Sequence, residues 1–143
     1  MKINTNNYAE VTEILQEIST LASKKINEIY SDDIKEFRKE DNSPVTVADI
    51  ESNRIIIDKL SKNFRNIKLI SEESSERSLQ GEEEFFIIDP LDGTKEFIKK
   101  NGEFTVNIAL IQKTRPVLGI VELPVSFTQY YSCLLYTSPS PRD

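Results

Sequence analysis

The chain has 143 residues, of which 38% are hydrophobic and 29% are charged, as in a folded globular domain or part of a larger protein. Its formal net charge of −6 argues against nonspecific nucleic-acid binding, which needs clustered lysines and arginines. It has no histidine and a single cysteine, Cys133, which excludes internal disulfides, histidine-based triads, and zinc sites built from thiolates or imidazoles. Any chemistry must therefore use carboxylates, hydroxyls, lysines or bound ions.

The first half of the chain predicts helices. Apolar residues recur every three or four positions from about residue 6 to residue 30, which indicates a long amphipathic helix. A polar stretch (31–40) and a turn (41–44) follow. The Thr-x-x-acid spacing of Thr46 and Asp49 then predicts a capping box that opens a second helix, which continues to Phe64.

Beyond residue 66 the hydrophobic period changes to that of strands. Five strands are expected, at residues 67–70, 85–88, 104–110, 117–123 and 127–131. Two helices followed by strands predict an α/β (α+β) layered sandwich, in which the two N-terminal helices cover a largely antiparallel sheet. The tail 132–143 contains Ser-Pro-Ser-Pro and is not expected to extend the sheet. A disordered terminus and a non-native tail both stay open.

No apolar run approaches the roughly 20 residues that span a bilayer, and the first six residues lack the apolar core of a signal peptide. The sequence therefore predicts a cytoplasmic protein without a transmembrane segment.

Two aspartates follow the apolar run Phe85–Ile88. Asp92 and Gly93 form a common turn dipeptide, so an ordinary turn is one interpretation. The alternative is that Asp89 and Asp92 converge at the end of the strand. Carboxylates about 4 Å apart repel by several kcal/mol at an effective dielectric near 20, so a cation between them is expected. Oxygen ligands alone indicate a hard ion, Mg²⁺ or Ca²⁺.

Other residues near these aspartates also have two interpretations. Thr94 begins a short expected helix whose free amides could face a phosphate. Glu72 directly follows the neighbouring strand and is a further candidate ligand, whereas Glu73 and Glu76 are expected to be solvated. Asp49 either closes the capping box or faces the metal site and accepts a hydrogen bond from Thr94, and spacing alone does not decide between these roles.

Three motifs occur in the order DNSPVTVAD (41–49), SEE (71–73) and DPLDGTKEFIKKNGEFTVNIALI (89–111). Together they resemble the metal-dependent, lithium-sensitive phosphatases of the inositol monophosphatase superfamily. The segments KEF (95–97) and NGEF (101–104) resemble its bacterial 3'(2'),5'-bisphosphate nucleotidase branch. The resemblance implies removal of the 3'-phosphate from adenosine 3',5'-bisphosphate, a small-molecule by-product of sulfate assimilation.

The resemblance also implies roles for individual residues. Its metal ligands fall on Glu72, Asp89, the Leu91 carbonyl and Asp92. Its water-activating pair falls on Asp49 and Thr94. The substrate phosphate would be contacted by Glu72, Leu91, Asp92, Gly93 and Thr94. The resemblance also implies two or more Mg²⁺ ions and inhibition by Li⁺. It further implies a cytoplasmic location that can include the periphery of the inner membrane.

Family members carry a further Trp-Asp signature whose aspartate completes a second metal site, and this chain contains no tryptophan. Residues 1–131 are therefore expected to be the amino-terminal catalytic domain of such a phosphatase, incomplete at the C-terminus, followed by the tail 132–143 and lacking the carboxyl-terminal domain. Alone, the chain is expected to be inactive. Two alternatives are an inositol or sugar phosphate phosphatase of the same superfamily, and a non-catalytic domain that binds divalent cations.

Overall fold

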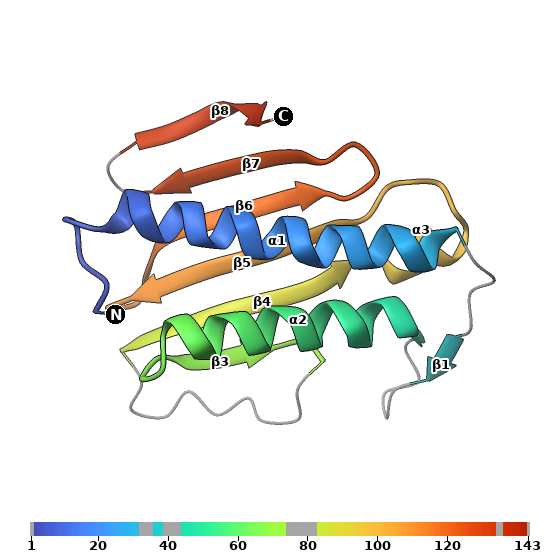
Figure 1. The fold of residues 1–143 in the computed structure, drawn as a ribbon, viewed down its shortest axis with the longest axis horizontal. Coiled ribbons are helices and arrows are strands. Elements are labelled where there is room, and N and C mark those ends of the chain that lie inside the picture. The colour runs from blue at the N-terminus through green and yellow to red at the C-terminus, as the bar shows by residue number, and fades with distance from the viewer. Residues whose placement is uncertain (1, 32–35, 39–43, 74–82, 134–135, 143) are drawn as a thin grey trace.

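The computed structural model describes residues 2–31, 36–38, 44–73, 83–133 and 136–142. Helices α1 (Tyr8–Tyr30) and α2 (Val47–Asn63) lie side by side on one face of a six-stranded sheet (Figure 1). In spatial order, its strands are β3 (Lys68–Ser71), β4 (Glu84–Asp92), β5 (Thr105–Gln112), β6 (Arg115–Leu123), β7 (Thr128–Cys133) and β8 (Tyr136–Arg142). The β3–β4 pair is parallel and the other pairs of this sheet are antiparallel. The predicted arrangement of two helices on a largely antiparallel sheet is confirmed.

Two short strands were not predicted. Within the expected polar stretch, β1 (Glu36–Arg38) pairs antiparallel with β2 (Pro44–Thr46) as a separate two-stranded ladder. Three residues per strand leave too little hydrophobic alternation for a sequence pattern to show them. Of the predicted turn, residues 41–43 lie outside the described residues, as does Glu76, and Pro44 belongs to β2.

The prediction that the tail cannot extend the sheet is wrong. Strand β8 pairs antiparallel with β7, from Cys133 opposite Tyr136 to Gln129 opposite Arg142. The pairing register shifts between Tyr131 and Gln129, and the two prolines of β8 fall within that irregular stretch. As the outermost strand, β8 tolerates proline where a central strand would not, because its outer amides need no partner strand.

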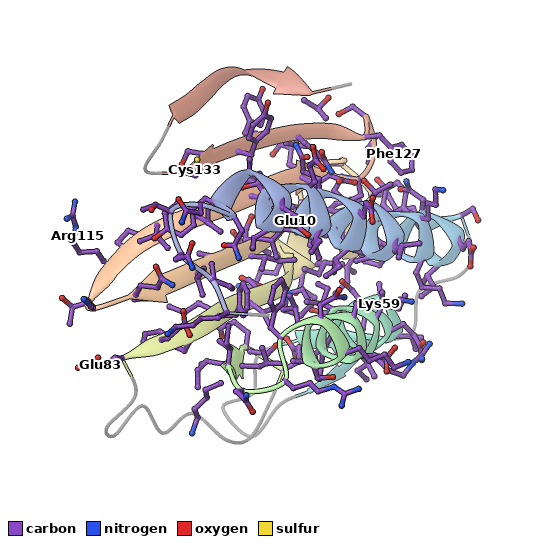
Figure 2. All side chains as sticks on the ribbon, turned by 60° about the vertical axis from the view of Figure 1, so that its left-hand side comes forward. Glu10, Lys59, Glu83, Arg115, Phe127 and Cys133 are labelled. Carbon is purple, nitrogen blue, oxygen red and sulfur yellow. The ribbon has the colours of Figure 1, made fainter. Side chains whose placement is uncertain are left out.

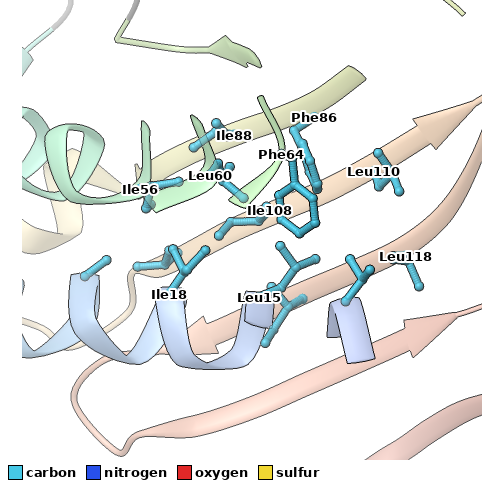
Figure 3. Close-up of a cluster of buried hydrophobic side chains, with 14 of the residues drawn as sticks. Leu15, Ile18, Ile56, Leu60, Phe64, Phe86, Ile88, Ile108, Leu110 and Leu118 are labelled. Carbon is cyan, nitrogen blue, oxygen red and sulfur yellow. The ribbon is translucent and has the colours of Figure 1, made fainter. Parts of the chain in front are cut away.

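The core lies between the two helices and the sheet (Figure 3). Leu15 and Ile18 of α1, Leu60 of α2 and Phe64, which directly follows α2, pack onto the inward residues of β4 and β5. Phe64 and Phe86 pack with ring centroids 5.2 Å apart, and both rings are almost fully buried. Truncating either ring to alanine would cost about 3 to 5 kcal/mol of stability, because a cavity would remain in a close-packed interior.

A buried glutamate ties α1 to the sheet. Glu122 occupies an inward position of β6, and its Oε1 accepts hydrogen bonds from Ser19, Thr20 and Gln129. The Gln129 amide also donates to the Gln16 carbonyl on α1 at 2.9 Å. These bonds satisfy the buried Oε1 of Glu122 in place of water, and they join α1 to β6 and β7.

The surfaces of the two faces differ. Glu10 and Lys59 lie on the exposed sides of the helices, and Arg115 extends into solvent where β5 turns into β6 (Figure 2). The opposite face of the sheet exposes Ile87, Val121 and Tyr130, and no helix among the described residues covers it. None of the helices in the described part of the chain combines the length and the apolar character needed to cross a bilayer.

Candidate active site

A β-bulge brings Asp89 and Asp92 to the same face of the sheet. Asp89 lies opposite Asn107, but Asp92 lies opposite Thr105, so three steps along β4 match two steps along β5. Side chains alternate between faces along a strand, and residues three apart would normally point to opposite faces. The extra residue of the bulge offsets this alternation, so Asp89 and Asp92 point to the same face. The predicted end of the strand at residue 88 is therefore wrong, because β4 continues through the bulge to Asp92.

Side chains hold this bulge from both neighbouring elements. Ser52 of α2, which is fully buried, donates a hydrogen bond from its hydroxyl to the Pro90 carbonyl at 2.7 Å. Asn107 of β5 donates from Nδ2 to the carboxylate of Asp92 at 3.5 Å. The bulge therefore has defined contacts at its centre and at its exposed end.

Asp49 makes both of the hydrogen-bonding contacts that the sequence left open. Its Oδ2 accepts hydrogen bonds from the Thr46 backbone N–H at 2.9 Å and the Thr46 hydroxyl at 2.7 Å, which completes the predicted capping box of α2. Its Oδ1 accepts a hydrogen bond from the Thr94 hydroxyl at 2.8 Å. Asp49 is fully buried, so the carboxylate depends on these donors rather than on water.

Gly93 and a cluster of aromatic rings fix the position of Thr94. Gly93 has φ +97°, and a Cβ there would lie 2.9 Å from the Glu103 carbonyl oxygen, so only glycine fits without strain. Thr94 begins α3 (Thr94–Ile98), which is confirmed as a short helix. Five residues cannot form a stable helix alone. The ring of Phe97 holds α3 in place, because it is fully buried and packs edge-on against Phe104 at 5.1 Å.

The end of β3 places Glu72 beside β4. Ser71 pairs with Ile88, and the Glu72 N–H donates to the Ile88 carbonyl at 3.1 Å, one residue before Asp89. The Glu72 side chain is exposed and that of Glu73 is half-buried, the reverse of the expected order. Glu72 still bonds to β4 like a strand residue. Because side chains alternate between the two faces of a strand, Glu72 points away from the side on which Ser71 is buried.

The environment of Asp89 disfavours its charged form. Burial, and after it the neighbouring charges of Asp92 and Glu72, raise the pKa of Asp89 from 3.8 to about 6. A hydrogen bond from the Leu91 N–H opposes this rise in pKa, and the charge of Glu73 adds a smaller increase. Like charges held together in a partly desolvated place oppose ionisation, which a bound cation would reverse.

The carboxylates do not yet enclose an ion. Across 2–31, 36–38, 44–73, 83–133 and 136–142, no three acidic, histidine or cysteine side chains gather tightly enough to hold a metal. Asp89 and Asp92 share a face through the bulge, and Glu72 follows on the neighbouring strand with an exposed side chain. The donor set, oxygen only and negatively charged, fits Mg²⁺ or Ca²⁺.

Sequence reasoning missed the residues that support the site. Ser52 and Asn53 lie three and four positions after Asp49, so helical spacing places all three on one side of α2. We call Asp49, Ser52 and Asn53 the polar stripe of α2. They contact, in turn, Thr94, the Pro90 carbonyl and Ser71. Spacing from Asp49 was the signal that could have identified the other two.

Comparison with known proteins assigns the chain to a family. The model of the inositol monophosphatase family matches residues 7–136. The chain belongs to the inositol monophosphatase family. A 3'(2'),5'-bisphosphate nucleotidase CysQ of Salmonella typhimurium is 50% identical over 97 residues, and that of Haemophilus influenzae is 36% identical over 118 residues.

Solved structures of the family share the fold. The crystal structure of CysQ from Bacteroides thetaiotaomicron has a TM-score of 0.74 and 39% identity, over 88% of this chain and 46% of that one. The suhB protein of Bartonella henselae has a TM-score of 0.81 and 25% identity, over 89% of this chain and 50% of that one. The match to the Salmonella protein covers 66% of this chain and 39% of the relative, so this chain spans well under half of that relative's length.

Proposed function

We propose that this chain is the amino-terminal catalytic part, residues 1–131, of a Mg²⁺-dependent phosphatase that removes the 3'-phosphate of adenosine 3',5'-bisphosphate. The observation that carries the proposal is the hydrogen bond from Thr94 to Asp49, next to a bulge that aligns Asp89 and Asp92. The identity to relatives named 3'(2'),5'-bisphosphate nucleotidase supports the choice of substrate.

Thr94 and Asp49 are suited to activating water. The only hydrogen of the Thr94 hydroxyl is donated to Asp49 Oδ1, so the lone pairs of Thr94 accept a hydrogen from an incoming water. The water then presents its own lone pair to phosphorus. As its oxygen attacks, its proton passes to Thr94 Oγ1 while the Thr94 proton passes to Asp49, and the ribose oxygen leaves from the opposite side.

Glu72, Asp89, Asp92 and the Leu91 carbonyl would hold the metal. Mg²⁺ would neutralise charge on the phosphate and on the departing oxygen. The substrate phosphate would be contacted by the segment 91–94, where Gly93 would allow the backbone to approach because it has no side chain. This cradle and the metal ligands are part of the proposal.

The test joins residues 7–131 of this chain to the remainder of the Salmonella typhimurium relative and measures phosphate release in Mg²⁺. We expect kcat/KM to be at least tenfold higher for adenosine 3',5'-bisphosphate than for inositol 1-phosphate. A preference for the inositol phosphate would assign the chain to a different substrate class. We expect the 143-residue chain alone to release phosphate more than tenfold more slowly than the chimera.

A calorimetric titration separates an enzyme from a plain cation-binding domain. The chain is titrated with Mg²⁺ in the presence and absence of adenosine 3',5'-bisphosphate. An active-site fragment should bind Mg²⁺ more tightly when the nucleotide supplies phosphate oxygens to the ion. Equal affinity with and without the nucleotide would favour the cation-binding alternative.

A further inference from the structure

We infer that Asn53 is a positioning residue, which acts through Ser71 to hold Glu72 where it can reach a metal shared with Asp89. The inference rests on the proposed metal site and extends it to a residue that does not itself contact the metal. Its basis is the middle of α2, where Asn53 contacts the end of β3.

The contact is short and directional. The Ser71 hydroxyl donates to Asn53 Oδ1 at 2.5 Å, and Ser71 is 1% exposed. Because its hydrogen is committed to Asn53, the Ser71 oxygen can only accept, and it accepts the Glu73 N–H at 3.3 Å. The amide of Asn53 therefore sets which way the Ser71 lone pairs point.

These bonds fix the backbone on both sides of Glu72. Its own N–H is bonded to the Ile88 carbonyl, and the next N–H, that of Glu73, is bonded to Ser71. The two bonds hold the Glu72 backbone beside Asp89, because Ser71 pairs with Ile88 and the residues that follow them are Glu72 and Asp89.

The position of β3 makes this support necessary. Within the described residues, β3 is an edge strand of four residues that pairs with β4 and with no second strand. Short edge strands fray readily. The two other members of the polar stripe contact the bulge and the beginning of α3, and Asn53 supplies the corresponding contact for β3.

Groups that orient metal ligands typically change metal affinity by 10- to 100-fold when they are removed. We therefore expect Asn53→Ala to weaken Mg²⁺ binding to the chain by at least tenfold in a titration. The matched control is Asn63→Ala, which removes an asparagine that donates to the Lys59 carbonyl at the far end of the same helix. That control should leave Mg²⁺ affinity within about twofold of wild type.

A double-mutant cycle assigns the effect to the pair. Ser71→Ala should weaken Mg²⁺ binding as much as Asn53→Ala, and the double variant no more than either, because one interaction is lost in all three. Ser71→Thr, which keeps the hydroxyl, should restore most of the affinity. Additive losses would overturn the inference, since they would mean that the two residues act independently.

Hydrogen exchange in metal-free protein gives a readout without metal or catalysis. Asn53→Ala should speed exchange at the Glu72 and Glu73 amides and leave the Leu110 amide of the central strand unchanged. Unchanged exchange at these amides would overturn the inference.

The outcomes for metal binding are distinguishable. A wild-type chain that binds Mg²⁺ while Asn53→Ala binds it equally well would overturn the inference and leave the proposed function standing. A wild-type chain with no Mg²⁺ affinity, or one whose affinity is unchanged by Glu72→Gln, would overturn the metal site itself and the inference with it.

Discussion

The two oxygens of Asp49 allow its structural and chemical roles to be tested separately. Thr46→Val removes the hydroxyl that caps α2 but leaves Asp49 bonded to Thr94. Thr94→Val removes the other partner and leaves the cap. Asp49→Asn can keep its oxygen toward Thr46, but it then directs an NH₂ group at Thr94 and reverses the direction of that hydrogen bond.

The expected magnitudes follow from these contacts. Thr46→Val should destabilise the chain by about 2 kcal/mol, at the upper end for an N-cap, because Thr46 is fully buried and caps the Ala48 and Asp49 amides. Thr94→Val and Asp49→Asn should lower kcat by roughly 10²-fold or more, or about 3 kcal/mol of transition-state stabilisation. Losing one hydrogen bond should cost Thr94→Val only about 1 kcal/mol of stability.

Stability is measured on the chain by urea unfolding, and kcat on the chimera with the Salmonella typhimurium relative. We expect Thr46→Val to lower stability while kcat stays within about tenfold, and Asp49→Asn to show the opposite pattern. If Asp49→Asn keeps more than a tenth of the wild-type kcat, Asp49 is a helix cap only, and the water-activating role of the pair is wrong.

Three further predictions concern the bulge and the loop after it. In the chimera, Asp92→Asn should lower kcat more than tenfold, because a neutral amide cannot balance the charge of the ion, and a smaller loss would return Asp92 to a turn residue. In the metal-free chain at pH 7, Asp89→Asn should raise stability by about 1 kcal/mol. The pKa of Asp89 rises from 3.8 to about 6 on folding, so wild-type stability falls as pH increases from about 4 to about 6. The full shift would correspond to about 3 kcal/mol, which solvent screening of this half-buried group reduces. Urea unfolding at pH 3.5 should show no gain, and a gain that persists there would contradict the electrostatic cause. Gly93→Ala should cost about 2 kcal/mol or more in the same assay, because of its positive φ and the close Glu103 carbonyl. Its control, Gly102→Ala, also has a positive φ but meets only the Val125 side chain at 3.8 Å, so an equal loss would show that crowding at Gly93 is unimportant.

Local patterns predicted the helices and most strands because each depends on residues close in sequence. The period of apolar residues identified α1, and the spacing of Thr46 and Asp49 identified the start of α2. The bulge at Asp89 could not be predicted in this way. It exists only relative to β5, whose register with β4 is set by long-range packing. The sequence therefore indicated which carboxylates to consider, but it did not predict the β-bulge that aligns them.

The two interpretations of Asp49 were weighed as alternatives, but the structure contains the hydrogen bonds that each of them requires. A carboxylate has two oxygens with separate lone pairs, so one can cap a helix while the other accepts from a distant residue. This double use has a consequence for the site. The cap fixes Asp49 to the first turn of α2, and that turn is held to the bulge by Ser52. Thr94 is therefore oriented by a group anchored to the same helix that holds the bulge of Asp89 and Asp92. If the proposed roles hold, a shift of α2 would move the proposed water-activating pair and the proposed metal ligands of β4 together, which would preserve the distances between them.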